Sequence, residues 1–243
     1  MRRCVVSLGV GQRYGVGLKR LGAGLAANGY VGAISLNNEY PAGCPTHEDI
    51  PYGFKPWLID RARRDGYDQV LWMDSACVAV RPVDGLFRQM HRDGVAFAYS
   101  PFRLWEWCSD ACAEKMGVLR ARLRGMCPSM WACVMGFDFT HAKTNEFLDR
   151  WLAHSRDGVT FHGAWTNDNG EVSADADVKG HRHDQTVACI LAFEMGLPFS
   201  WDVVQYDVQN IMPLEGYESA LTIPAFPTYI LSNHNVKTRP HAD

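Results

Sequence analysis

The stretch at residues 67–84 constrains the fold most, because an apolar run within it ends abruptly in an acid. Residues 70–73, Val-Leu-Trp-Met, follow the turn-like pair at 65–66 and lead directly into Asp74 and Ser75. A short run of large apolar residues after a turn predicts a strand buried on both faces. Because ligands gather at the carboxyl ends of strands in open α/β sheets, we expect Asp74 to lie at the functional site.

Composition and charge limit the classes of protein to which the chain can belong. Its 243 residues suit one large α/β domain spanning residues 1–243. A hydrophobic content of 47% and a charged content of 21% are ordinary for a globular protein. The formal net charge of −3 provides no general attraction to nucleic acid or to an anionic membrane.

The cysteines and the first residues bear on the cellular compartment. The eight cysteines are scattered and include no Cys-X-X-Cys pair, so we expect buried free thiols in a reducing cytoplasm. The N-terminus moves straight into a strand-like run, without the apolar segment of a signal peptide. No apolar stretch approaches the roughly 20 residues that a membrane span needs. We therefore expect a soluble cytoplasmic protein with no membrane partner.

Apolar runs and helical spacing predict the order of the secondary structure. Strands are expected at residues 5–8, 31–36, 70–73, 94–99 and 130–139, with a last one starting near residue 229. Helices are expected at residues 15–27, 56–64, 82–91, 101–126, 141–154 and 184–195. The polar segment 157–180 is expected to be mobile and to act as a lid.

A glycine-rich turn follows the first predicted strand. Strand, glycine-rich turn and helix together bring backbone N–H groups to a phosphate or a base. The spacing in residues 9–15 matches neither Gly-X-Gly-X-X-Gly nor a P-loop. A tight turn without a ligand therefore stays an equal alternative.

Two charged residues stand at predicted helix starts. Lys55 precedes Pro56, which suits a first helical turn, and is either a contact to a phosphate or a solvated lysine. Asp184 opens a helix that Gly196 and Pro198 terminate. It is either an N-cap or a functional carboxylate in the unusually polar run at residues 181–185.

Three further sequence motifs each allow a functional and a structural interpretation. Residues 175–177 spell a literal Asp-Ala-Asp, but no apolar strand precedes it to fix the carboxylates. Trp105 and Trp107 either offer aromatic faces to a substrate or pack internally. The alternating arginines either bind an anionic substrate or form a solvated face: Arg120, Arg122 and Arg124.

The order of these motifs resembles that of GT-A fold glycosyltransferases, in particular the glycogenin-like enzymes. In that family a hydrophobic strand runs into an Asp-X-Asp motif, which here reads Asp74-Ser75-Ala76 and lacks the second acid. The resemblance spans nearly the whole chain. It implies a single GT-A (Rossmann-like) α/β domain at residues 1–243, with a mixed, mostly parallel sheet and helices on both faces.

The same resemblance implies roles for individual residues. Asp184 and Gln185 match the catalytic pair. The donor nucleotide and its phosphates would contact Ser7, Gly9, Tyr14, Lys55, Asp74, Ser75, His183, Lys237 and Arg239. A divalent ion, Mn²⁺ or Mg²⁺, would be held by Asp74 and His234. Because Asp74 and His234 both follow strand-like runs, we expect a parallel sheet to deliver them to one edge.

The implied reaction is transfer of a sugar from a nucleoside diphosphate, a UDP-sugar, to a hydroxyl group. The acceptor stays open between a glycan, a small molecule and a modified DNA base, as in phage enzymes that glycosylate hydroxymethylated bases. Because Ala76 replaces a ligand, a non-catalytic sugar-nucleotide-binding protein is a second alternative. The residues His181-X-His183-Asp184 raise a third, a metal-dependent hydrolase. The oligomeric state stays open.

Overall fold

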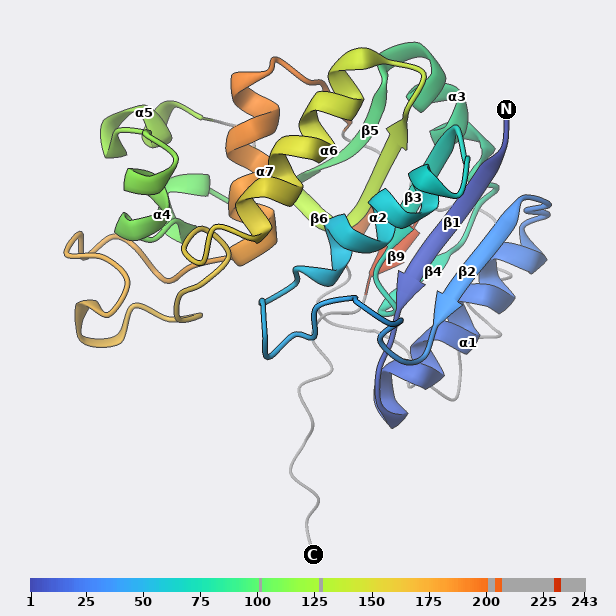
Figure 1. The fold of residues 1–243 in the computed structure, drawn as a ribbon, viewed down its shortest axis with the longest axis horizontal. Helices are drawn as coiled ribbons and strands as arrows, with labels where there is room; N and C mark the ends of the chain where they lie inside the picture. Colours follow the sequence, from blue (N-terminus) through green and yellow to red (C-terminus); the bar gives the residue numbers. More distant parts are fainter. Residues whose placement is uncertain (101, 127–128, 201–203, 207–229, 233–243) are drawn as a thin grey trace, which may run out of the picture.

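A six-stranded sheet forms the centre of the computed structural model, which describes residues 1–100, 102–126, 129–200, 204–206 and 230–232 (Figure 1). The strand order is β2-β1-β3-β6-β5-β7, with β1 (Arg3–Leu8), β2 (Ala33–Asn37), β3 (Gln69–Met73), β5 (Val95–Ser100), β6 (Ser129–Asp138) and β7 (Phe199–Ser200). Strand β6 is antiparallel to β3 and β5, and the other neighbours are parallel. The predicted mixed, mostly parallel sheet is confirmed.

Side chains of the central strands alternate between two hydrophobic cores. Val70 and Trp72 of β3 enter one core, while Leu71 and Met73 enter the other, as the two-residue period of a strand requires. The first core lies under α2 (Phe54–Arg64), α6 (Ala142–Ser155) and α7 (His183–Glu194). The second lies under α1 (Gln12–Ala27) and α3 (Asp84–Asp93). The continuous apolar runs follow from this burial on both faces.

The region predicted as one helix at residues 101–126 is broken into three short pieces, so that prediction is wrong. The pieces are η1 (Leu104–Trp107), α4 (Asp110–Lys115) and α5 (Arg120–Gly125). Cys108 is extended, and Gly117 has a φ of 68°, which a helix interior does not accommodate. Each break turns the chain, so its apolar residues can reach the first core from several directions.

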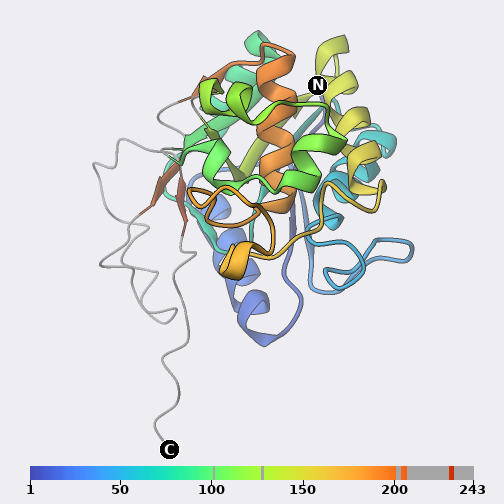
Figure 2. The same cartoon turned by 90° about the vertical axis from the view of Figure 1, so that its left-hand side faces the viewer.

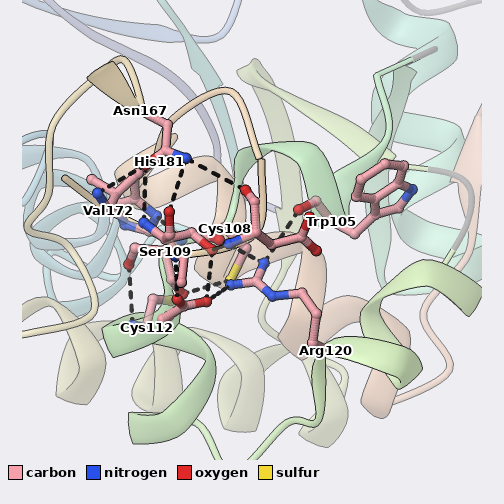
Figure 3. Close-up of polar contacts among 12 residues, drawn as sticks. Trp105, Cys108, Ser109, Cys112, Arg120, Asn167, Val172 and His181 are labelled. Carbon is pink, nitrogen blue, oxygen red and sulfur yellow. Dashed lines mark hydrogen bonds and ion pairs between the residues drawn. The ribbon is translucent and has the colours of Figure 1, made fainter. Parts of the chain in front are cut away.

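The polar segment after α6 lies against α4 and contains only the short turn η2 (Asp168–Gly170) (Figure 2). The Asp110 N–H donates to the Val172 carbonyl oxygen at 2.9 Å, and the Asp110 carboxylate accepts from the Ser173 hydroxyl and the Ala174 N–H. Figure 3 shows Asn167 and Val172 of this segment beside Ser109 and Cys112. Backbone and side chains therefore hold the segment onto the protein body.

A second, three-stranded sheet has the order β4-β9-β8, formed by β4 (Cys77–Ala79), β9 (Ile230–Ser232) and β8 (Val204–Tyr206). The expectation that the last strand joins the main sheet is therefore wrong. The apolar run after Asp74 forms β4, and β9 pairs with it antiparallel, with Ser232 opposite Cys77. His234 lies outside the described residues, and the end of β9 is directed toward the Asp74–Ala76 turn.

The described part of the chain bears on two expectations from composition, the burial of the cysteines and the lack of a membrane span. Its seven cysteines are all buried. None of its helices combines the length and the apolar character that crossing a membrane would require.

Helix α1 packs tightly against the turn that carries Asp74. A Cβ atom at Gly17 would overlap the carbonyl oxygen of Ser75, so only glycine allows this approach. One turn further along, the buried Arg20 donates from Nη2 to the Ala76 carbonyl oxygen at 2.7 Å. The helix thus fixes the backbone of the turn from behind.

Gly17→Ala should lower the free energy of unfolding by about 1–3 kcal/mol, because the added methyl group overpacks the interface. Gly15→Ala is the matched control, since a Cβ at Gly15 meets no atom within 4 Å. That control should raise stability by about 0.5–1 kcal/mol through helix propensity. Urea denaturation measures both, and equal effects of the two substitutions would contradict the packing described here.

Candidate active site

A pocket of about 270 Å³ opens at the carboxyl ends of the parallel strands β1 and β3. Its polar lining comes from the turn after β1, the loop before α2, the start of α2 and the turn after β3. The lining residues are Leu8, Gly9, Val10, Tyr14, Tyr40, His47, Tyr52, Phe54, Lys55, Trp72, Asp74, Ser75 and Ala76. This is the edge at which α/β sheets bind ligands.

The ammonium group of Lys55 connects two carboxylates at the floor of this pocket. Its Nζ lies 3.2 Å from Asp74 Oδ1 and 2.9 Å from Asp184 Oδ2, and it donates to the Ala132 carbonyl oxygen at 3.1 Å. Two carboxylate oxygens and one carbonyl oxygen therefore surround the ammonium group. Lys55 is 3% exposed, and the ring of Tyr52 lies 4.9 Å from Nζ.

Burial and charge act in opposite directions on this cluster. Burial lowers the pKa of Lys55, but the attraction of Asp184 and Asp74 outweighs it and leaves that pKa raised. For Asp184, burial outweighs the attraction of Lys55 and raises its pKa to about 6. Lys55 is therefore a fixed positive charge, and Asp184 is a carboxylate that releases its proton close to neutral pH.

Asp74 is fixed by two further contacts at the sheet edge. The Trp72 indole Nε1–H donates to Asp74 Oδ1 at 2.8 Å, and the Asp74 N–H donates to the Cys133 carbonyl oxygen at 2.8 Å. Its side chain is 16% exposed, compared with 5% for Asp184. Asp74 thus faces the pocket, while Asp184 lies behind Lys55.

Two buried histidines form the entrance of α7. The Ser109 N–H donates to His181 Nδ1 at 3.3 Å, so Nε2 carries the proton and donates to the Thr160 carbonyl oxygen at 2.9 Å. Burial lowers the pKa of His181 to about 4 and that of His183 to about 3. Both rings are therefore neutral at pH 7.

Left-handed backbone occurs at two positions that touch across the site. Tyr52 has a φ of 61° and His183 a φ of 42°, and their rings stack with centroids 5.7 Å apart. Such conformations cost about 1–3 kcal/mol each in residues with a side chain, and they concentrate at functional sites. The contact joins the start of α2 to the start of α7.

The structure brings together most, but not all, of the residues predicted for the site. Gly9, Tyr14, Lys55, Asp74 and Ser75 line the pocket. Behind them, Asp184 pairs with Lys55, and His183 stacks on Tyr52.

The remaining predicted residues lie elsewhere. Ser7 is fully buried inside β1 and does not line the pocket. Gln185 is half-buried at the start of α7. His234, Lys237 and Arg239 lie outside the described residues.

One side of the pocket is an aromatic wall that the sequence did not predict. Tyr40, His47, Tyr52, Phe54 and Trp72 supply much of the pocket surface. The aromatic residues just before Lys55 were an available signal, but the loop at 38–53 has no periodic pattern that would place them. Lys55 lies under this wall, which explains how an ammonium is accommodated at 3% exposure.

The literal Asp-Ala-Asp at residues 175–177 forms ion pairs with an arginine. Arg124 Nη2 lies 2.9 Å from Asp175 Oδ2 and 3.4 Å from Asp177 Oδ2. Arg120 similarly pairs with Asp110. Arg120 and Arg124 thus form ion pairs that connect separate segments of the chain. The carboxylates of Asp175 and Asp177 are the partners of Arg124 in these contacts.

The tryptophans considered as a substrate platform are covered by arginines. The guanidinium of Arg124 lies 4.0 Å from the ring of Trp105, and that of Arg182 lies 3.7 Å from the ring of Trp107. Both contacts are internal cation–π interactions. The packing interpretation therefore describes these two residues better.

The described residues do not by themselves suit a divalent ion. Asp74 is one carboxylate where an Asp-X-Asp motif supplies two, and its charge is already balanced by Lys55. The described part of the chain contains no group of three or more His, Cys, Asp and Glu side chains arranged to hold a metal. The predicted Mn²⁺ or Mg²⁺ site at Asp74 thus depends on His234.

No protein-family model and no curated protein matches this chain. Several solved structures do share its fold. A glycosyltransferase involved in glycosylation of the major capsid of PBCV-1 aligns with a TM-score of 0.52 at 9% identity, covering 97% of this chain and 94% of that one. Mouse xyloside xylosyltransferase 1 aligns with a TM-score of 0.52 at 9% identity, covering 99% and 100%.

The bifunctional glycosyltransferase WbbM aligns with a TM-score of 0.51 at 9% identity, covering 96% of this chain and 46% of that protein. At this level of identity the likeness establishes the fold. The chain has the GT-A fold of glycosyltransferases, as its motif order implied.

Replacing Lys55 should destabilise the protein, because two buried carboxylates lose their cation. Lys55→Met should lower the free energy of unfolding by about 3–5 kcal/mol at pH 7, because Asp74 and Asp184 are left uncompensated. Adding Asp184→Asn removes one of these charges, so the double variant should be more stable than the single one. Urea denaturation measures both variants, and a double variant as unstable as Lys55→Met would contradict the ion-pair assignment.

Because His181 is held neutral in the folded protein, the free energy of unfolding should decrease as the pH is lowered. An unfolded histidine has a pKa near ~6.5, so between pH 6.5 and 4 the unfolded chain binds a proton that folded His181 does not. The free energy of unfolding therefore has its full value above pH 6.5. It decreases below that pH by up to about 1.4 kcal/mol per pH unit.

His181→Gln is the control, because glutamine can accept from Ser109 and donate to Thr160 without titrating. Denaturation curves at pH 7, 6 and 5 should show the wild type losing stability relative to this variant. A constant difference between the two proteins across this range would show that His181 is not held neutral.

Proposed function

We propose that the protein transfers a sugar from a nucleoside diphosphate donor, a UDP-sugar, to a hydroxyl group. One observation carries the proposal: Lys55 joins Asp74 and Asp184 at the floor of the pocket, within a fold that solved glycosyltransferases share. The assignment to the glycogenin-like subgroup is part of this proposal. It rests on the order of the motifs along the chain.

The elements around the pocket match the parts of such a donor. The turn after β1 presents backbone at Gly9 and Val10, and Tyr14 is 50% exposed beside it, as suits a planar base. Asp74 and Ser75 lie at the end of β3, where the diphosphate would arrive. The aromatic wall excludes water from one side, which strengthens electrostatic interactions inside the site.

Lys55 and Asp184 would stabilise the charges that develop at the reacting centre. As the glycosidic bond breaks, the leaving diphosphate gains negative charge and the sugar gains positive charge. The Lys55 ammonium provides fixed positive charge without reorganisation. With a pKa of about 6, Asp184 is ionised at pH 7. From behind Lys55 it would stabilise the positive sugar through its charge, whereas accepting a proton from the acceptor hydroxyl would first require the carboxylate to reach the pocket, which it does not line.

Lys55 is already surrounded by Asp74, Asp184 and the Ala132 carbonyl oxygen. A phosphate would have to compete with these contacts for the ammonium group. Further positive charge would come from Lys237 and Arg239, and Mn²⁺ held by Asp74 and His234 stays part of the proposal on the sequence alone. If bound, the ion would act as a Lewis acid on the diphosphate.

The test is a screen of the purified protein against UDP-, GDP- and CMP-sugars, with and without Mn²⁺, measuring release of the nucleotide. We expect turnover with a UDP-sugar and a loss of at least about 100-fold in Asp74→Asn, since electrostatic groups at reacting centres contribute on this scale. The thermal midpoint of Asp74→Asn should stay close to that of the wild type. Asp93→Asn, which alters a surface ion pair with Arg92, is the matched control and should keep full activity.

Turnover that survives Asp74→Asn would refute the site. Nucleotide binding without turnover would favour the alternative of a non-catalytic sugar-nucleotide-binding protein. A DNA acceptor gains no support from the arginine run, because Arg120 and Arg124 are engaged in internal ion pairs.

A further inference from the structure

Trp165 is a large aromatic residue that lies exposed next to the pocket. Its side chain belongs to the segment between α6 and α7, and the residue is 44% exposed. Its ring centroid lies 5.8 Å from that of Tyr52 and 4.8 Å from that of His183, both in edge-on geometry. The guanidinium of Arg182 lies 4.5 Å from the ring centroid. Three side chains therefore orient a ring that still faces solvent.

The backbone around Trp165 is held in place as firmly as its ring. A Cβ at Gly180 would overlap the carbonyl oxygen of Trp165, so the two strands of the loop approach each other closely. Next to this contact, the His181 N–H donates to the Ala164 carbonyl oxygen at 2.9 Å, and the Asn167 N–H donates to the Lys179 carbonyl oxygen at 3.0 Å.

The Asn167 side chain adds to these contacts. It accepts from the N–H groups of Val172 and Ser173, each at 3.0 Å, within the polar network around His181 (Figure 3). The exposed ring is thus a preorganised surface, and binding there would cost little ordering entropy.

Strained backbone marks the same place. Tyr52 and His183, the two left-handed residues of the site, are both direct ring partners of Trp165. Tyr52 also lines the pocket and lies over Lys55. Trp165 therefore extends the pocket wall outward, separated from the Lys55 ammonium by the single ring of Tyr52.

Exposed polar residues follow Trp165 in the same loop. Thr166, Asp168 and Asn169 follow it directly and are exposed, and the Thr166 hydroxyl donates to Asp168 Oδ2 at 2.7 Å. An exposed aromatic ring in a loop that also carries amide, hydroxyl and carboxylate groups fits a pyranose ring. Such a ring has apolar C–H faces and a rim of hydroxyls.

We propose that Trp165, oriented by Arg182, Tyr52 and His183, forms an acceptor subsite that stacks on a sugar ring, so that the acceptor is a carbohydrate. The proposal rests on the proposed transfer reaction. It goes further by naming the acceptor class and the residue that selects it. Trp165 determines specificity through binding and takes no part in the chemical step.

Binding of methyl glycosides of glucose, galactose and mannose tests the subsite without relying on turnover. Saturation-transfer NMR on the wild type should show contact to the ring C–H protons of at least one glycoside. In Trp165→Ala this signal should disappear, while Trp165→Phe, which keeps an aromatic face, should retain it. Phe193→Ala removes another exposed aromatic residue, at the far end of α7, and should leave the signal unchanged.

Kinetics with the donor identified by the screen provide the second readout. Trp165→Ala should raise KM for the glycoside about tenfold, the change that a contact of about 1.4 kcal/mol produces. Hydrolysis of the donor without acceptor should change less than about twofold, because the subsite acts on the acceptor alone.

The outcomes separate the two proposals. Loss of the NMR signal in Trp165→Ala supports the subsite even when no donor is turned over, which would refute only the transfer reaction. A wild type that contacts no glycoside, or a Trp165→Ala variant with unchanged signal and KM, refutes the subsite. Contact to an oligothymidine instead of the glycosides would refute it in favour of a nucleic acid acceptor.

Discussion

A single buried ammonium group holds the site together. Lys55 lies between Asp74 at the end of β3 and Asp184 in the first turn of α7, two residues that are 110 positions apart in the sequence. Two carboxylates with so little exposure could not face each other without a cation between them. The position of α2, which carries Lys55, therefore determines how close the edge of the sheet and the start of α7 can come.

The surrounding elements maintain this arrangement from several sides. Helix α1 supports the Asp74–Ala76 turn through Gly17 and Arg20, and β6 supplies the carbonyl of Ala132 to Lys55. Strained backbone at Tyr52 and His183 joins the starts of α2 and α7 through stacked rings. Free energy lost to this strain is offset by burial elsewhere, as is common at functional sites.

Sequence reasoning predicted the sheet, most helices and the separate importance of Lys55, Asp74 and Asp184, because each follows from local periodicity or from motif order. It did not predict that Lys55 would pair with both acids, since the pairing depends on how distant elements pack. The same limit explains Trp165 and the part of the aromatic wall formed by Tyr40, His47 and Tyr52, which lie in loops without a periodic pattern. Strand β9 was assigned to the wrong sheet because a three-residue strand gives no signal for its partner.

The indole proton of Trp72 reports directly on the central claim, because it is bonded to Asp74 at the floor of the pocket. Its resonance can be assigned in an ¹H–¹⁵N NMR spectrum by comparison with Trp72→Phe and followed while UDP and then GDP are added. If the Lys55 cluster is the floor of a nucleotide-sugar site, the Trp72 resonance should shift as one nucleotide saturates the protein. A Trp72 resonance that stays unchanged with both nucleotides would contradict the account.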